Sequence, residues 1–216
     1  MEWLLPFVLW CLAGYVCGAT PFGYFAGKLR GIDIREHGSG NIGATNVIRV
    51  MGKGIGIPVF ILDVIKGWLP AWMAGRWFAG HGAGASLVTG VTIATGVAAV
   101  LGHNYTFWLK GKGGKGIATS CGVLLATAPV ELGVAVVVWI VTAKLTKYVS
   151  VASIAAALTI PTMMIVLMAG SGRWDAIRLG FGVALCALAI WRHKANIQRL
   201  MAGTENKMGA KKASAP

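Results

Sequence analysis

Residues 117–143 read IATSCGVLLATAPVELGVAVVVWIVTA, an apolar segment that decides how many helices the chain forms. One membrane span needs about 20 apolar residues, so the segment is long for one span and short for two. Pro129 and Glu131 lie at its centre, and a proline inside a helix removes a backbone donor and favours a break. The segment therefore forms either one long helix or two short helices that turn near Pro129.

The rest of the chain has the composition of a membrane protein. Of its 216 residues, 56% are hydrophobic and 12% are charged, and the mean hydropathy is +0.69. A soluble protein of this composition would expose too much apolar surface. Further apolar segments run over residues 3–26, 55–79, 86–102, 149–170 and 176–191. We therefore predict an all-α polytopic membrane protein with one integral-membrane domain at 1–206 and a short basic, disordered tail at 207–216.

Basic residues decide between the two forms of the 117–143 segment, because Lys and Arg concentrate on the cytoplasmic side of membrane proteins. If the segment crosses the membrane once, Lys144, Lys147 and the basic C-terminal tail face outward. If it turns near Pro129, they join most of the 20 Lys and Arg on the cytoplasmic side. This second form predicts about seven transmembrane helices, some of them short, with the N-terminus out and the C-terminus in. It leaves few basic residues outside: Arg76, Arg173 and Arg178.

Cysteine and histidine patterns argue against a metal or another cofactor. The four cysteines, Cys11, Cys17, Cys121 and Cys186, lie in apolar segments without CxxC spacing, which is typical of packed thiols. No histidines have HxxxH or HExxH spacing. The net charge of +13 is spread over loops between apolar segments, so we do not expect a nucleic acid partner.

In the predicted arrangement, four polar stretches end at the same membrane face: residues 38–49, 102–116, 147–153 and 193–200. The second contains GKGGKG, whose residues are Gly111, Lys112, Gly113, Gly114, Lys115 and Gly116. Glycines allow backbone N–H groups to surround an anion, and the helix expected from Ile117 adds partial positive charge. This pattern predicts a phosphate site. It is not a Walker A loop, because Gly116 follows the lysine in place of Ser or Thr. The alternative to a phosphate site is a flexible basic loop that binds lipid head groups nonspecifically.

The stretch GSGNIGATN at 38–46 offers similar chemistry with less charge. Its side chains can form hydrogen bonds with oxygen-rich groups, and Arg49 can bind phosphate through two parallel hydrogen bonds. The alternative is a polar turn followed by an N-capped helix. Polar backbone at membrane depth is tolerated where it lines a cavity, so we expect this stretch to form one wall of a site. The residues concerned are Ser39, Asn41, Thr45 and Asn46.

Asp63 and Lys66 lie three residues apart in the second apolar segment and are predicted to pair on one helix face. Charged residues inside a membrane often have a function, although a structural pair that fixes the helices is an equal alternative. Four further polar residues lie at cytoplasmic ends of spans and can donate to phosphate or to a carbonyl: His103, Asn104, His193 and Asn196.

Several motifs occur in one order along the chain: SGNIGATNVIRVMGK, DVIKG, LGHNY with KGGKGIAT, KYVSVASI and HKANIQRLMAGTE. Together they resemble the acyl-phosphate-dependent glycerol-3-phosphate acyltransferases of bacteria, over residues 3 to about 206. The resemblance implies a seven-helix inner-membrane enzyme with its active site on the cytoplasmic side. Such an enzyme transfers a fatty acyl group from acyl phosphate to the sn-1 hydroxyl of glycerol 3-phosphate, which gives lysophosphatidic acid and phosphate in the first acylation of phospholipid synthesis.

By position, the resemblance assigns the catalytic contacts to Ser39, Arg49, Lys115, Ser153, His193 and Asn196. Substrate binding is expected from the remaining polar and glycine residues of the motifs, namely Asn41, Thr45, Asn46, Lys66, His103, Asn104, Gly111, Lys112, Gly113, Gly114, Gly116 and Ser150. The chain departs from the family pattern where Thr106 replaces the usual proline and HKAN replaces HREN. These departures concern the shape of a loop and a salt bridge.

The expected partners are acyl phosphate, glycerol 3-phosphate and membrane lipids. Acyl phosphate already carries a good leaving group, so its transfer needs positioning and charge stabilisation. The chain has no GxSxG motif and no His-x4-Asp pattern, which favours direct attack without an acyl-enzyme. His103, His193 or a phosphate oxygen can accept the hydroxyl proton. The alternatives are an organic-phosphate transporter, for which the halves show no repeated motif, and a lipid-binding scaffold.

Overall fold

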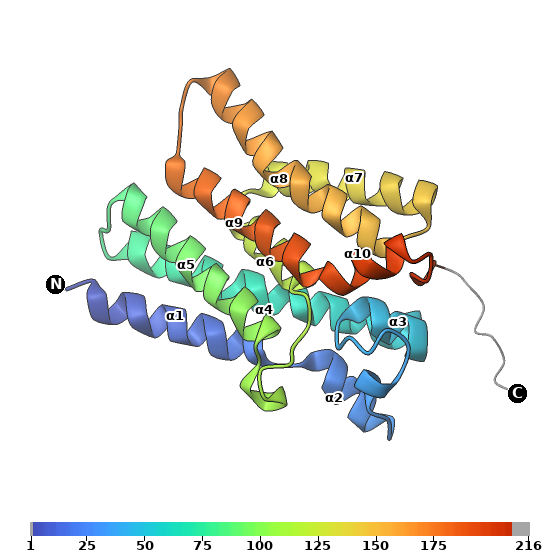
Figure 1. The fold of residues 1–216 in the computed structure, drawn as a ribbon. Coiled ribbons are helices and arrows are strands. Elements are labelled where there is room, and N and C mark those ends of the chain that lie inside the picture. Colours follow the sequence, from blue (N-terminus) through green and yellow to red (C-terminus); the bar gives the residue numbers. More distant parts are fainter. Residues whose placement is uncertain (1, 209–216) are drawn as a thin grey trace, which may run out of the picture. The chain divides into compact units, whose positions relative to one another are not determined.

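The computed structural model describes residues 2–208, which form α-helices and short 3₁₀ helices without a β-strand (Figure 1). This confirms the predicted all-α fold. The chain divides into two compact units, Met1–Pro129 and Val130–Pro216, called here the first and the second unit and described separately. The single domain predicted at 1–206 stays a prediction, and most of the tail predicted at 207–216 lies outside the described residues.

The first unit is built on the long helix α4. Its neighbours α1, α5 and α6 pack against it, and α1 also packs along α5. Glycines bring two of these helix pairs into backbone contact: a Cβ at Gly18 would lie 2.0 Å from the Ala99 carbonyl, and one at Gly122 would lie 2.0 Å from the Val64 carbonyl. The helices are α1 (Leu4–Ala19), α2 (Phe22–Leu29), η1 (Ile34–Glu36), α3 (Ala44–Met51), α4 (Lys53–Gly80), α5 (Ala85–Asn104), η2 (Phe107–Leu109) and α6 (Ile117–Thr127).

The first apolar segment differs from the uninterrupted run expected at 3–26, because α1 and α2 are separated at Thr20 and Pro21. A residue before proline avoids helical backbone angles, and Thr20 is extended with φ −63° and ψ 113°. The carbonyl groups at the end of α1 therefore need partners outside the helix. The Ala19 carbonyl accepts a hydrogen bond from the buried Thr106 hydroxyl.

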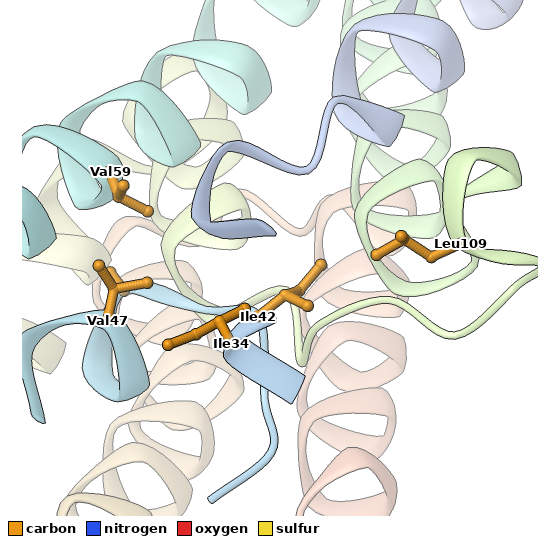
Figure 2. Close-up of a cluster of buried hydrophobic side chains, with 6 residues drawn as sticks. Ile34, Ile42, Val47, Val59 and Leu109 are labelled. Atoms are coloured by element: carbon orange, nitrogen blue, oxygen red, sulfur yellow. The ribbon is translucent and has the colours of Figure 1, made fainter. Parts of the chain in front are cut away.

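A buried apolar cluster holds the polar loop before α3 against the helices. It joins η1, the loop, α3, α4 and η2 through Ile34, Ile42, Ala44, Val47, Val59 and Leu109 (Figure 2). Burial of each Ile, Leu or Val side chain of this cluster contributes about 1.5–3 kcal/mol to the free energy of unfolding. The loop is therefore fixed at both ends, although its own residues are polar.

The second unit contains α7 (Pro129–Thr146), α8 (Val149–Ser171), α9 (Ala176–Arg192) and α10 (Lys194–Met201). Helices α8 and α9 pack on each other. The 117–143 segment is broken at Ala128, which confirms the break predicted near Pro129. Proline at the first position of α7 fits, because that residue needs no intrahelical N–H partner.

Five helical segments of residues 2–208 are long and apolar enough to cross a membrane, and the bent pair α9–α10 raises the number to six. Helix α6 has 11 residues, about 16 Å of helix, against a hydrocarbon core of about 30 Å. The chain is thus a multi-pass membrane protein. Seven spans and the orientation of the termini remain predictions.

Candidate active site

In the first unit, the loop at 37–46 is folded around one buried amide. The Asn46 side chain donates to the carbonyl groups of Ile34, His37 and Asn41 at 3.2, 3.0 and 2.9 Å. Its Oδ1 accepts from the Ser39 backbone N–H at 2.8 Å. A Cβ at Gly38 would lie 2.3 Å from the same oxygen, so glycine is required there. Asn46 therefore shapes the loop, and a contact with substrate stays a prediction.

The other predicted residues of this segment are Ser39, Asn41, Thr45 and Arg49. Asn41 Oδ1 accepts from the Gly43 N–H at 2.8 Å, which forms a tight turn into α3. Thr45 is exposed, and Ser39 and Arg49 are half-buried. Thr45 and Arg49 are four residues apart on α3 and so share a face of the helix. The N-capped helix considered as the alternative is not formed, because α3 begins after Gly43 without a side-chain cap within the described chain.

The glycine loop at 111–116 lies on the C-terminal end of α5. Its Gly113 N–H donates to the Asn104 carbonyl at 3.1 Å and its Gly114 N–H to the His103 carbonyl at 3.0 Å. A Cβ at Gly113 would lie 2.0 Å from the His103 carbonyl, and one at Gly114 would lie 2.0 Å from His103 Nε2. These glycines therefore allow close packing, and their N–H groups bond to the chain itself.

The N-terminus of α6 supplies the donors that the loop glycines do not. Gly116 precedes the helix with φ +79°, and no side chain within residues 2–208 caps this end. The first N–H groups of a helix have no intrahelical partner, and together with the helix dipole they favour an anion. Beside them Lys115 is half-buried, whereas Lys112 is exposed. The groups of this stretch that suit an anion therefore lie at its end, at Lys115 and the start of α6, and phosphate binding there stays a prediction.

Asn104 lies next to this helix end. It is fully buried, and its Oδ1 and Nδ2 have no hydrogen-bond partner among the described residues. Its Oδ1 lies 2.7 Å from the position that a Gly116 Cβ would take. Thr119 in the first turn of α6 also has a buried hydroxyl without a partner in residues 2–208. Buried polar groups of this kind cost about 1–3 kcal/mol unless something pairs with them, as a bound oxygen-rich group would.

Asp63 and Lys66 form a buried ion pair on α4, which confirms the predicted pairing. Lys66 Nζ lies 2.7 Å from Asp63 Oδ1 and also donates to the Thr20 carbonyl at 2.7 Å. His103 Nδ1 lies 3.8 Å from the same Asp63 oxygen. The Lys66 ammonium is thus already engaged by protein oxygens, and its contact with substrate stays a prediction.

In the second unit, three side chains converge on Glu205, a residue that sequence reasoning missed. Ser150 Oγ and Asn196 Nδ2 donate to Oε1 at 2.9 and 2.6 Å, and Arg199 Nε donates to Oε2 at 2.7 Å. Burial raises the pKa of the Glu205 carboxyl, but the hydrogen bonds from Asn196, Arg199 and Ser150 outweigh it and lower the pKa below its ordinary value. Glu205 ends the motif HKANIQRLMAGTE, which was the only signal for it.

Ser153 and His193 are the other predicted residues of this unit, and both are buried. The Ser153 hydroxyl accepts from the Trp139 indole N–H at 3.2 Å. His193 Nδ1 lies 2.7 Å from the Ala189 carbonyl, an atom that only accepts. Nδ1 therefore carries the proton, and Nε2 is the basic nitrogen of the neutral ring.

Within residues 2–208, no three His, Cys, Asp or Glu side chains are placed to hold a metal ion. The cysteines are free thiols on α1, α6 and α9, of which Cys186 is buried, Cys11 and Cys121 are half-buried and Cys17 is exposed. The first unit thus offers groups that suit an anion, and the second unit offers hydrogen-bonding side chains and the basic Nε2 of His193.

Comparison with known proteins agrees with this chemistry. The family model described as glycerol-3-phosphate acyltransferase matches residues 8–203. The chain is 44% identical to the glycerol-3-phosphate acyltransferase of Methylorubrum populi, over 92% of this chain and 91% of that protein. It is 42% identical to that of Gloeobacter violaceus, over 97% and 98% of the two chains.

Solved structures agree with the fold as well. The chain resembles the integral membrane glycerol 3-phosphate acyltransferase PlsY (YgiH) in its glycerol 3-phosphate form, with a TM-score of 0.83 and 37% identity over 94% of this chain and 96% of that one. The lysophosphatidic acid form of that protein matches with a TM-score of 0.81. These matches confirm the resemblance and the enzyme class expected from the motifs. The chain belongs to the glycerol-3-phosphate acyltransferase family.

Proposed function

We propose that the protein transfers a fatty acyl group from acyl phosphate to the sn-1 hydroxyl of glycerol 3-phosphate, at the cytoplasmic side of a bacterial inner membrane. The observation that carries the proposal is the anion site of the first unit. There the start of α6, which no side chain of residues 2–208 caps, follows the half-buried Lys115 and lies next to the amide of Asn104, which has no hydrogen-bond partner among those residues. Relatives named as glycerol-3-phosphate acyltransferases, one of them solved with glycerol 3-phosphate, support the acceptor.

The reaction suits the groups that the chain offers. The hydroxyl oxygen attacks the carbonyl carbon of the acyl phosphate, a carbon–oxygen ester bond forms, and the bond to the phosphate oxygen breaks. Phosphate leaves with the bonding electrons, and the hydroxyl proton passes to a base. Preorganised N–H groups and cations stabilise the charge on the departing phosphate without reorganising. We assign this role to the start of α6 and to Lys115.

We consider two acceptors for the hydroxyl proton. One is Nε2 of His193, which the hydrogen bond to Ala189 leaves as the basic nitrogen. The other is a phosphate oxygen of a substrate. A His193→Gln variant separates them. Loss of the acidic limb of the pH profile of kcat/KM, on which the rate falls as the histidine becomes protonated, supports the histidine, and an unchanged profile supports the phosphate oxygen.

We further propose that transfer is direct, without an acyl-enzyme. An enzymatic serine or cysteine nucleophile needs an adjacent base or a lowered pKa. The Ser153 hydroxyl contacts an indole N–H, the Ser150 hydroxyl contacts a carboxylate that three donors share, and the cysteines lie in apolar helices. The hydroxyl groups therefore position substrates.

Purified protein in lipid nanodiscs provides the test. With palmitoyl phosphate and glycerol 3-phosphate, we expect stoichiometric release of inorganic phosphate and lysophosphatidic acid. Palmitoyl-coenzyme A in place of palmitoyl phosphate should give no product, because its leaving group is a thiol rather than a phosphate. Product from the thioester alone would contradict the proposed donor, and no product from either donor would contradict the proposed activity.

A further inference from the structure

We propose that Asp63 and Lys66 are positioning residues, which set the glycine loop and the start of α6 through the ring of His103. The inference rests on the proposed function, because it concerns the same phosphate site. It assigns to the buried ion pair a role in binding the phosphate of a substrate without contact to that substrate.

The pair connects segments that are distant in the sequence. Lys66 Nζ contacts Asp63 at 2.7 Å and the Thr20 carbonyl at 2.7 Å, and it lies 5.4 Å from the centre of the Phe22 ring. Asp63 and Lys66 are 1% and 3% exposed. The pair therefore fixes the break between α1 and α2 to the middle of α4, where water does not compete for the contacts.

His103 connects the buried ion pair to the glycine loop. Its Nδ1 lies 3.8 Å from Asp63 Oδ1, while its Nε2 lies so close to Gly114 that a Cβ there would come within 2.0 Å. Its backbone carbonyl accepts the Gly114 N–H at 3.0 Å. One residue thus touches the buried carboxylate on one side and the glycine loop on the other, so a shift of its ring displaces Gly114 and the residues that follow.

A structural role of the pair and a role in positioning the loop can be separated by replacing both residues. Replacing a buried ion pair by apolar residues of similar size is often neutral or stabilising, whereas removing one partner costs about 3–5 kcal/mol. The double replacement therefore separates stability from positioning. Asp63→Leu/Lys66→Met removes both charges and the contact with His103, and Asp63→Asn/Lys66→Gln removes the charges but keeps groups that can form the same hydrogen bonds.

The experiment measures the thermal unfolding midpoint, both KM values, kcat and the inhibition constant of inorganic phosphate. For Asp63→Leu/Lys66→Met we expect a folded protein with a lower midpoint, because the Thr20 carbonyl loses its Lys66 donor. We also expect a rise of roughly tenfold in the phosphate inhibition constant and in at least one KM. A misplacement near 1 Å costs up to about 100-fold in rate, so a partial shift fits this range. Asp63→Asn/Lys66→Gln should recover most of the phosphate affinity.

An ion pair of the second unit with a half-buried arginine and a buried carboxylate serves as the control. Arg178 lies 3.1 Å from the buried Glu131 in the second unit, and neither residue belongs to the proposed site. Glu131→Leu/Arg178→Met should leave both KM values and the phosphate inhibition constant unchanged. An equal rise in this control would mean that the effect is general, and it would overturn the inference.

The inference is also overturned if Asp63→Leu/Lys66→Met folds and binds both substrates and phosphate within twofold of the wild type. Should that variant not fold, Gly114→Ala is combined with Asp63→Asn/Lys66→Gln. Residues that act through one contact give non-additive effects, so additive changes in the phosphate inhibition constant contradict the proposal. Turnover by the wild type reports on the proposed function, and only the comparison between variants reports on this inference.

Discussion

At the scale of single residues, the buried polar side chains divide into those that hold the fold and those that lack partners. Asn46 uses its whole amide to close the loop before α3. The Glu205 carboxylate accepts hydrogen bonds from Ser150, Asn196 and Arg199. Asn104 differs, because its amide is fully buried and unpaired within the described chain. Groups of the first kind should affect folding when replaced, and those of the second kind should affect binding.

Lys115→Ala tests the cation of the anion site. A charged hydrogen bond to phosphate is worth about 1.5–3 kcal/mol, so kcat/KM should fall by roughly 10- to 150-fold. Lys144 is exposed in the last turn of α7, and Lys144→Ala should keep the activity of the wild type. Steady-state kinetics of both variants checks this, and equal activities would remove Lys115 from the phosphate site.

Asn104→Asp tests the unpaired amide. A carboxylate beside the N-terminus of α6 places a negative charge where the phosphate is proposed to bind, and it therefore repels the phosphate. We expect the KM of a phosphate substrate to rise by about tenfold, which corresponds to a loss of about 1.4 kcal/mol of binding free energy. The thermal unfolding midpoint should not fall. An unchanged KM in this variant would show that Asn104 lies outside the binding site.

Glu205→Gln tests the carboxylate of the second unit by its pH dependence. Because the folded protein holds the pKa of Glu205 below its ordinary value of 4.5, the ionised carboxylate stabilises the fold above that pH. This contribution is lost as the pH falls from 4.5 through the lowered pKa. Denaturant unfolding should show a stability gap between wild type and variant at pH 7 that narrows in acid. A gap that stays constant between pH 7 and pH 3 would contradict the lowered pKa.

At the scale of elements, the break between α1 and α2 is held by side chains from elsewhere in the first unit. The Ala19 carbonyl accepts from Thr106 and the Thr20 carbonyl from Lys66. Such orphan carbonyl groups at a helix end need partners. The Thr106 hydroxyl supplies a contact that a proline at this position would lack.

Thr106→Val tests that contact. It keeps the shape of the side chain and leaves the buried Ala19 carbonyl without this donor, so the free energy of unfolding should fall by about 1–3 kcal/mol. Thr106→Ser should recover most of the loss, because it restores the hydroxyl. Chemical unfolding in detergent measures both, and equal stabilities of Val and Ser variants would show that the hydroxyl contributes nothing.

At the scale of the whole molecule, the sequence predicted contacts that are local and missed those that join distant residues. The Asp63–Lys66 pair followed from a spacing of three, and the break at Ala128 from a proline in a long apolar run. Glu205 was missed because Ser150 lies 55 residues away. Its nearer partners, Asn196 and Arg199, lie on α10, whereas Glu205 follows the helix, so helical spacing does not connect them. The glycine loop was assigned to phosphate, whereas the N–H groups of Gly113 and Gly114 bond to α5. Periodicity reports a helical face, but it does not report which backbone groups a neighbouring segment already uses.

The predicted topology is tested by thiol labelling. In a cysteine-free background, Lys147→Cys and Ala213→Cys should both react only with a reagent that enters the cytoplasm, because the basic residues around them favour that side. Ala213 lies outside the described residues, so its side of the membrane rests on the sequence alone. Labelling of either position by a reagent that stays outside the cell would contradict the seven-helix arrangement.

Direct transfer between two phosphate substrates is the central claim, and initial-rate kinetics with both substrates varied tests it most directly. If acyl phosphate and glycerol 3-phosphate are bound together when the hydroxyl attacks, double-reciprocal plots should give lines that intersect. Ser39→Ala and Ser153→Ala should then retain measurable turnover, because neither hydroxyl carries the acyl group. Parallel lines, together with an acylated serine or cysteine trapped after mixing with acyl phosphate alone, would contradict direct transfer.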